Sequence, residues 1–157
     1  MLDEHGGVID VVPRSVMRQG NLRHRAVYVV VCSGTRVLVH RRADWKDVWP
    51  SYWDLAFGGV CAAGETDEAS ARRELAEEAG ITVDPAELRP LGTGAYVDDA
   101  VDLVAAVFEI EHAGPFAFAD GEVVRVEWVP YEWLPMWIAA HVVVPDTLAI
   151  GVPLLTR

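Results

Sequence analysis

Hydrophobic and polar residues alternate along much of the chain with the period of a β-strand. A continuous apolar run over residues 26–32 and an alternating run over residues 36–40 flank the turn residues Ser33-Gly34-Thr35, which predicts a hairpin. Other runs have strand length and end at turn residues. We expect further strands at residues 8–12, 54–57, 88–96, 101–110 and 123–129.

One segment has the composition of a helix. Residues 67–79 are rich in Ala, Glu, Arg and Leu; Asp67 and Glu68 favour the positive N-terminal end, and Gly80 is a common stop. A shorter helical or turn segment is expected from Pro130 to Trp137. The order of strands, helix, strands, helix predicts an α+β fold, a mixed sheet with helices packed on it.

Length and charge limit what such a protein binds. With 157 residues we expect one domain, residues 1–157, and the composition (52% hydrophobic, 24% charged) is that of a globular protein. The net charge of −11 argues against nucleic acid polymers and anionic membranes as partners, and no apolar run reaches membrane-spanning length. Cys32 and Cys61 follow no metal-binding or disulfide pattern, and no secretory signal is recognised, so we expect a cytoplasmic protein.

The predicted helix carries three carboxylates close together. On a helical period Glu74, Glu77 and Glu78 fall within an arc of about 100°, beside the apolar side of Ala71, Leu75 and Ala79. Like charges at this spacing repel, and the last two lie near the negative end of the helix. The ordinary alternative is a solvated acidic face. A hard divalent cation would relieve the repulsion, since Mg²⁺ and Mn²⁺ prefer carboxylate oxygens.

The surrounding pattern favours the metal. Residues 59–81 read Gly-x5-Glu-x7-Arg-Glu-apolar-x-Glu-Glu-x-Gly-apolar, which resembles the Nudix box at every specified position, from Gly59 and Glu65 through Arg73 to Ile81. The resemblance implies the Nudix fold, a mixed sheet sandwiched by helices (α/β/α), with residues 59–81 as the catalytic loop and helix.

The same resemblance implies roles for individual residues. Glu74 and Glu78 would be the principal metal ligands, with Glu77 and the Gly59 carbonyl completing the site. Arg73 would pair with Glu65 and orient Glu74, and Glu74 is the leading choice of general base. Glu122 lies where several family members carry another acid, although an exposed turn acid is an equal alternative.

Upstream residues resemble a branch of the family that includes isopentenyl diphosphate isomerase and related hydrolases. Residues matching Arg42 and Lys46 grip the diphosphate in that branch, and Arg41 extends the same basic cluster. The isomerase's catalytic Cys, however, aligns with Gly58 and its catalytic Glu near Ala100. Without that acid–base pair the isomerase reaction is disfavoured.

These residues together predict a Mg²⁺-dependent enzyme, with Mn²⁺ as a substitute, that hydrolyses a phosphoanhydride bond in a nucleoside diphosphate derivative or another small organic diphosphate. The alternatives are a Nudix domain that binds nucleotide or diphosphate without turnover and, less favoured, an isomerase. We expect the loops at residues 43–53, 97–100 and 111–121 to select the substrate. Exposed tryptophans near the C-terminus would permit a homodimer.

Overall fold

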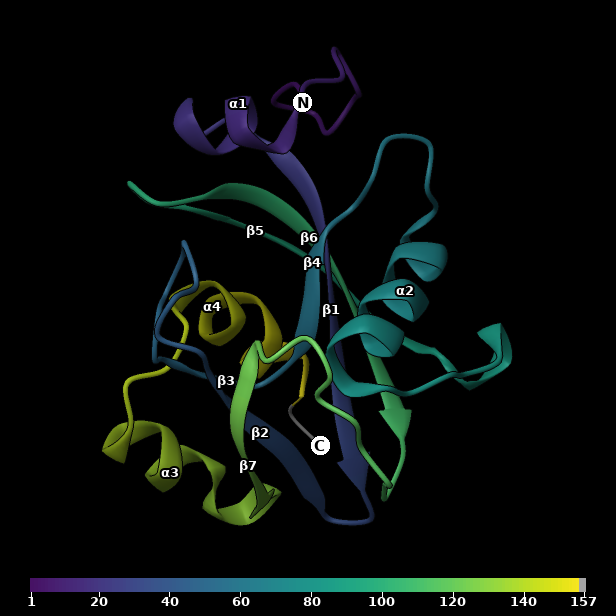
Figure 1. Ribbon diagram of the computed structural model, residues 1–157, viewed down its shortest axis with the longest axis vertical. Helices are drawn as coiled ribbons and strands as arrows, with labels where there is room; N and C mark the ends of the chain where they lie inside the picture. Colours follow the sequence, from purple (N-terminus) through teal and green to yellow (C-terminus); the bar gives the residue numbers. More distant parts are fainter. Residues whose placement is uncertain (156–157) are drawn as a thin grey trace.

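A seven-stranded mixed sheet forms the centre of the protein. The computed structural model describes residues 1–155. The strands follow the chain as β1 (His24–Ser33), β2 (Arg36–Arg42), β3 (Trp53–Asp54), β4 (Phe57–Val60), β5 (Arg89–Val97), β6 (Asp102–Glu111) and β7 (Val123–Pro130). The helices are α1 (Arg14–Gln19), α2 (Asp67–Ala79), α3 (Leu134–Ala140) and α4 (Pro145–Leu154), with short 3-10 turns at Pro85–Glu87 and Tyr131–Trp133 (Figure 1).

Strand β1 organises the sheet. One edge of β1 pairs in parallel with β6 along its length, while the other edge is shared: residues 26–29 pair with β4, and Cys32 and Ser33 pair with β2. The outer strands β5, β7 and β3 continue in antiparallel order. Because β2 and β4 occupy successive parts of one edge, they diverge from β1 and leave room between them.

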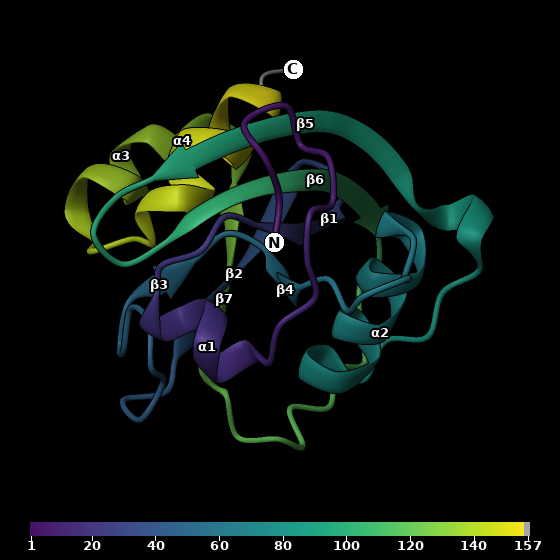
Figure 2. The same ribbon diagram turned by 90° about the horizontal axis from the view of Figure 1, so that it is seen from above.

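Helices cover both faces of the sheet, which explains why residues 26–32 of β1 form a continuous apolar run instead of alternating. Val27, Val29 and Val31 lie in the cluster that packs against α2, whereas Ala26 and Val30 lie in the cluster that packs against α4. Figure 2 shows the two layers, with α2 on one side and α3 and α4 on the other. The predicted α+β class and the hairpin at residues 33–36 are confirmed.

Helix α2 begins and ends at the predicted residues for identifiable reasons. The side chain of Thr66 accepts a hydrogen bond from the Ala69 amide at 3.2 Å and caps the N-terminus. Gly80 takes the left-handed conformation (φ 67°), which a glycine adopts without strain, and ends the helix.

The ends of the chain differ from expectation. Residues 8–12 were expected to form a strand, but only an isolated bridge between Leu2 and Val8 is present, because Val8, Ile9 and Val11 are exposed and find no neighbouring strand. Instead α1 follows directly after Pro13. Helix α4 was not expected, because Gly151 and Pro153 interrupt its helical pattern, although Pro145 suits a first helical position.

Two further observations concern the surface. Of the C-terminal tryptophans, Trp133 is largely exposed, whereas Trp137 stacks on His141 and meets Trp53 edge-on. None of the helices within residues 1–155 combines the length and apolar character needed to cross a bilayer.

Candidate functional site

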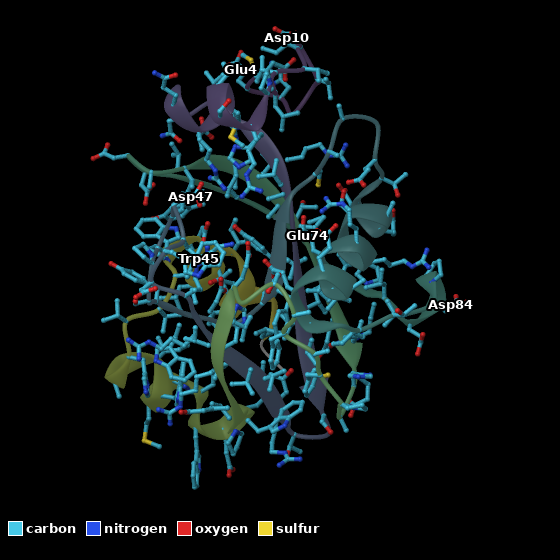
Figure 3. All side chains as sticks on the ribbon, in the orientation of Figure 1. Glu4, Asp10, Trp45, Asp47, Glu74 and Asp84 are labelled. Carbon is cyan, nitrogen blue, oxygen red and sulfur yellow. The ribbon has the colours of Figure 1, made fainter. Side chains whose placement is uncertain are left out.

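Two of the three helix carboxylates are buried at the edge of the sheet. Glu74 and Glu78 are each only 8% exposed, and Glu78 accepts a hydrogen bond from the Gly58 amide at 3.0 Å. Glu77 remains exposed. Figure 3 shows Glu74 directed from α2 toward β4. The sequence pattern therefore placed all three on one flank, and the fold buries the two that adjoin the apolar side.

Burial disfavours the charged form of both carboxylates. It raises the pKa of Glu78 well above its ordinary value, and the charge of Glu74 raises it further against the lowering effect of the Gly58 amide. Burial also raises the pKa of Glu74, although the Arg73 guanidinium opposes the shift. Both groups would therefore gain from a nearby positive charge.

Arg73 connects the loop to the helix. Its Nε and Nη2 donate to the two oxygens of Glu65 at 3.1 Å each, and its Nη1 donates to Glu74 at 2.6 Å and to Glu77 at 3.3 Å. Glu65 also accepts from the Ser70 hydroxyl at 2.7 Å. The Arg73 and Ser70 bonds lower the pKa of Glu65 to about 2, so this pair is charged at neutral pH.

Glu122 reaches the same place from a distant part of the sequence. It pairs with Lys46, and its negative charge contributes to the raised pKa of Glu78. Partial burial alone would raise the pKa of Glu122, but the bond and charge of Lys46, the bond with Glu78 and the charge of Arg42 together lower it. The predicted acid at residue 122 and the predicted cation at residue 46 thus lie beside α2.

The predicted basic cluster is divided by strand geometry. Arg42 lines the cavity described below; its Nη2 donates to the Val48 carbonyl at 3.0 Å and its Nη1 meets Asp54 at 3.5 Å. Arg41 does not line the cavity: it is exposed, and its Nε donates to the Ser51 carbonyl at 3.3 Å. Neighbouring residues of a strand point to opposite faces, so Arg41 and Arg42 do not form the single basic cluster that the sequence suggested.

A cavity of about 600 Å³ brings these groups together. Its walls include Gly59, residues of α2, Arg42 at the end of β2, and Lys46 from the loop that follows β2. Of the three loops expected to select the substrate, residues 43–53 and 111–121 contribute and residues 97–100 do not. The lining side chains with the relevant chemistry are Arg42, Lys46, Arg73, Glu74, Glu77, Glu78 and Glu122.

The cavity also contains polar residues that the sequence did not indicate. Tyr28, Asp54 and Asp146 are buried in its wall. Burial raises the pKa of Asp54 to about 6 despite the opposing charge of Arg42, and burial raises the pKa of Asp146 and of Tyr28 as well. An aspartate inside an apolar strand run was the only available signal for Asp54. Asp146 belongs to α4, a helix that no sequence motif predicted.

The N-terminal segment is the second unexpected wall. Met1, Leu2, Asp10, Arg14 and Arg18 all line the cavity. Figure 2 shows this segment crossing in front of β6, β1 and β4 before it reaches α1.

The donor groups are suited to a divalent cation, although within residues 1–155 no three His, Cys, Asp or Glu side chains converge as a ready-made metal site. Glu74 accepts a hydrogen bond from Arg73, and Glu78 accepts one from the Gly58 amide. The fit rests on Glu74 and Gly59: a Cβ added to Gly59 would lie 2.9–3.0 Å from the Glu74 carboxylate, so the absent side chain leaves space where a carboxylate and a backbone carbonyl adjoin. Hard oxygen donors with excess negative charge are what Mg²⁺ binds.

Comparison with known proteins places this geometry in context. Residues 22–147 match the model of the NUDIX domain family. The chain is 34% identical over 163 residues to orf19, an uncharacterized Nudix hydrolase of Rhodococcus erythropolis, covering 94% of this chain and 86% of that protein. It is 38% identical over 133 residues to the Nudix hydrolase YfcD of Escherichia coli (strain K12), covering 84% and 73%. The crystal structure of DR0079 from Deinococcus radiodurans superposes with a TM-score of 0.81 at 25% identity, covering 94% of this chain and 93% of that one.

Proposed function

Because the chain belongs to the Nudix hydrolase family, we propose that it hydrolyses a phosphoanhydride bond in a small organic diphosphate with the help of Mg²⁺. One observation carries the proposal: two buried, undercompensated carboxylates, Glu74 and Glu78, share a cavity with the cations Arg42 and Lys46. Carboxylates that could bind a metal ion and cationic side chains that could bind phosphate therefore line the same cavity.

Glu74 and Glu78 would hold the cation, with the Gly59 carbonyl, Glu77 and Glu122 as further ligands, and Mn²⁺ would substitute for Mg²⁺. When bound, the cation supplies positive charge that offsets the diphosphate and lowers the pKa of water. Lys46 and Arg42 would bind the diphosphate oxygens. Arg73 would keep Glu74 in place through its bond to that carboxylate and its paired bonds to Glu65.

Glu74 is the proposed general base. Its carboxylate lines the cavity and lies beside the space that the absent Gly59 side chain leaves, where a water molecule can approach it. Glu74 takes a proton from water as the water oxygen bonds to phosphorus, and the bond from phosphorus to the bridging oxygen breaks, its electron pair leaving with that oxygen.

The remainder of the substrate is proposed to be polar, as in a nucleoside or sugar diphosphate. Tyr28, Asp54 and Asp146 line the cavity with buried oxygen atoms, which favour hydroxyl and amino donors over an isoprenoid chain. We propose a reducing, cytoplasmic setting for the reaction, because Cys32 and Cys61 follow no disulfide pattern in the sequence.

To test the proposal, the protein is incubated with Mg²⁺ in ¹⁸O-labelled water and a panel of candidate substrates, and the products are identified by mass spectrometry. The panel contains nucleotide sugars, dinucleotides, nucleoside triphosphates and isoprenoid diphosphates. We expect cleavage of a polar diphosphate with ¹⁸O on a phosphate product. Binding without cleavage would indicate a non-catalytic module, and a shifted double bond without cleavage would indicate an isomerase. Either result would overturn the proposal.

A further inference from the structure

The N-terminal segment adds a wall to the cavity from outside the family domain. The family match begins at residue 22, yet residues from Met1 to Arg18 line the same space as Glu74 and Arg42. The segment is fixed in place rather than loosely appended. The Leu2 amide donates to the Arg23 carbonyl at 2.8 Å, the Leu22 amide donates to the Met17 carbonyl at 3.0 Å, and the side chains of Leu2 and Met17 are buried.

Arg18 is a partly buried cation of this segment with a single long ion pair. Its side chain is 23% exposed, and within residues 1–155 its one ion pair joins Nε to Asp47 Oδ2 at 3.7 Å, beyond hydrogen-bond distance. Asp47 itself is 56% exposed, and water weakens such a pair. The Arg18 Nε atom is buried without a hydrogen-bond partner among the described residues.

Other guanidinium groups crowd the same region. Burial lowers the pKa of Arg18, and the charges of Arg14 and Arg42 lower it further against the raising effect of Asp47. Arg42 pairs with the buried Asp54 at 3.5 Å, whereas Arg18 pairs with the more exposed Asp47 at 3.7 Å, so the charge of Arg18 is the less compensated of the two. By contrast Lys46 pairs with Glu122, and Arg73 pairs with Glu65 through two bonds.

We propose that Arg18 is an anion-binding residue of the cavity, where it contacts the diphosphate of the substrate together with Arg42. This inference rests on the proposed function, since that function supplies the diphosphate. A guanidinium offers several donors in a planar fork that matches phosphate oxygens, and the partly buried position of Arg18 makes such a contact stronger than it would be on the surface. Arg18, Arg42 and Glu74 all line the cavity, so a ligand bound there would meet both guanidinium groups and a carboxylate.

Isothermal titration with inorganic pyrophosphate and Mg²⁺ tests the proposal in the full chain. Arg18→Gln should weaken pyrophosphate binding about 10- to 100-fold, the size expected for a charged hydrogen bond. Arg23→Gln is the matched control: Arg23 also has an unpartnered Nε and an ion pair at 3.7 Å, with Asp102, but it does not line the cavity. The control should bind within about twofold of the unchanged protein. Equal affinities of the Arg18 and Arg23 variants would overturn the proposal.

Two more variants separate ligand binding from a structural role. Asp47→Asn removes the ion pair while keeping Arg18, so pyrophosphate should bind as tightly as before or more tightly. A loss as large as that of Arg18→Gln would show that Arg18 acts only through Asp47, which overturns the proposal. If thermal melting shows that the glutamine variant does not fold, Arg18→Lys takes its place, and its lost fork should still weaken binding measurably.

The outcome is separable from that of the proposed function. Hydrolysis of a diphosphate with the same KM in Arg18→Gln and the unchanged protein would remove Arg18 from the site and leave the function standing. Arg18-dependent pyrophosphate binding without hydrolysis of any substrate would do the reverse.

Discussion

At the residue scale, Glu78 combines features that a purely structural glutamate rarely combines. It is buried, its pKa is raised, and it accepts a hydrogen bond from the Gly58 amide. A helix selected for stability alone would place an apolar residue here. The cost of the charge therefore points to a ligand that compensates it.

We predict that Glu78→Gln lowers turnover by roughly 10³-fold while the fold survives, because the proposed metal contributes several kcal/mol of transition-state stabilisation. Steady-state kinetics at saturating Mg²⁺, with circular dichroism to verify folding, checks this. Turnover at the unchanged rate would move the chemistry away from α2.

The same burial predicts a pH dependence of stability without metal. A carboxyl whose folded pKa lies above the unfolded value of about 4.3 binds its proton more tightly in the folded state, so stability is highest below that value. Stability is then lost as the pH rises through the folded pKa. Urea unfolding in EDTA should show a free energy of unfolding that declines above about pH 4, and Glu78→Gln should flatten the decline. A steeper decline in the variant would contradict the assignment.

Glu74→Gln should be neutral or stabilising in EDTA, because the amide removes a charge yet still accepts the hydrogen bond from Arg73. Urea unfolding of this variant at pH 7 provides the measurement. A loss of several kcal/mol without metal would give Glu74 a structural role instead.

At the scale of elements, two adjacent glycines of β4 are expected to differ in role, Gly58 in stability and Gly59 in activity. A Cβ at Gly58 (φ +156°) would lie 1.9 Å from the Val27 carbonyl oxygen within the β1–β4 pair, whereas a Cβ at Gly59 would meet the movable Glu74 carboxylate. Gly58→Ala should therefore cost about 3 kcal/mol or more of stability. Gly59→Ala should cost about 1 kcal/mol or less but reduce turnover at least about tenfold, since it displaces a proposed ligand. Thermal unfolding and kinetics of both variants test the pair, and the reverse ranking would refute it.

Elements also show which features a sequence can predict. Helix α2 and the grouping of Glu65, Arg73 and Glu74 follow from local spacing, because the first two turns of the helix and one short loop bring them together. Arg41 was grouped wrongly because proximity along a strand does not mean a shared face. Asp54, Asp146 and Arg18 meet only through packing of distant elements, and no local pattern encodes that.

At the scale of the whole molecule, a net charge of −11 repels anionic ligands, and only the cations of the cavity offset it locally. Binding of Mg²⁺ should therefore stabilise the folded state. At a free concentration about a hundred times Kd the gain is about 2.7 kcal/mol, or a rise in Tm of roughly 5–10 °C for a chain of this size.

Differential scanning calorimetry with and without Mg²⁺ measures this rise, and the Glu74→Gln/Glu78→Gln double variant is the control that should show almost none. An equal rise in the double variant would place the cation elsewhere.

The parallel pairing of β1 with β6 has a consequence for how the chain folds. It joins His24 to Leu103 and Cys32 to Glu111, so the central ladder cannot close until the ribosome has released most of the chain. Helix α2 is synthesised after β1 and before β6. Its apolar side therefore stays exposed until these two strands have paired. Refolding should accordingly be slow for a domain of this size, and nascent chains that stop before residue 111 should be prone to aggregation.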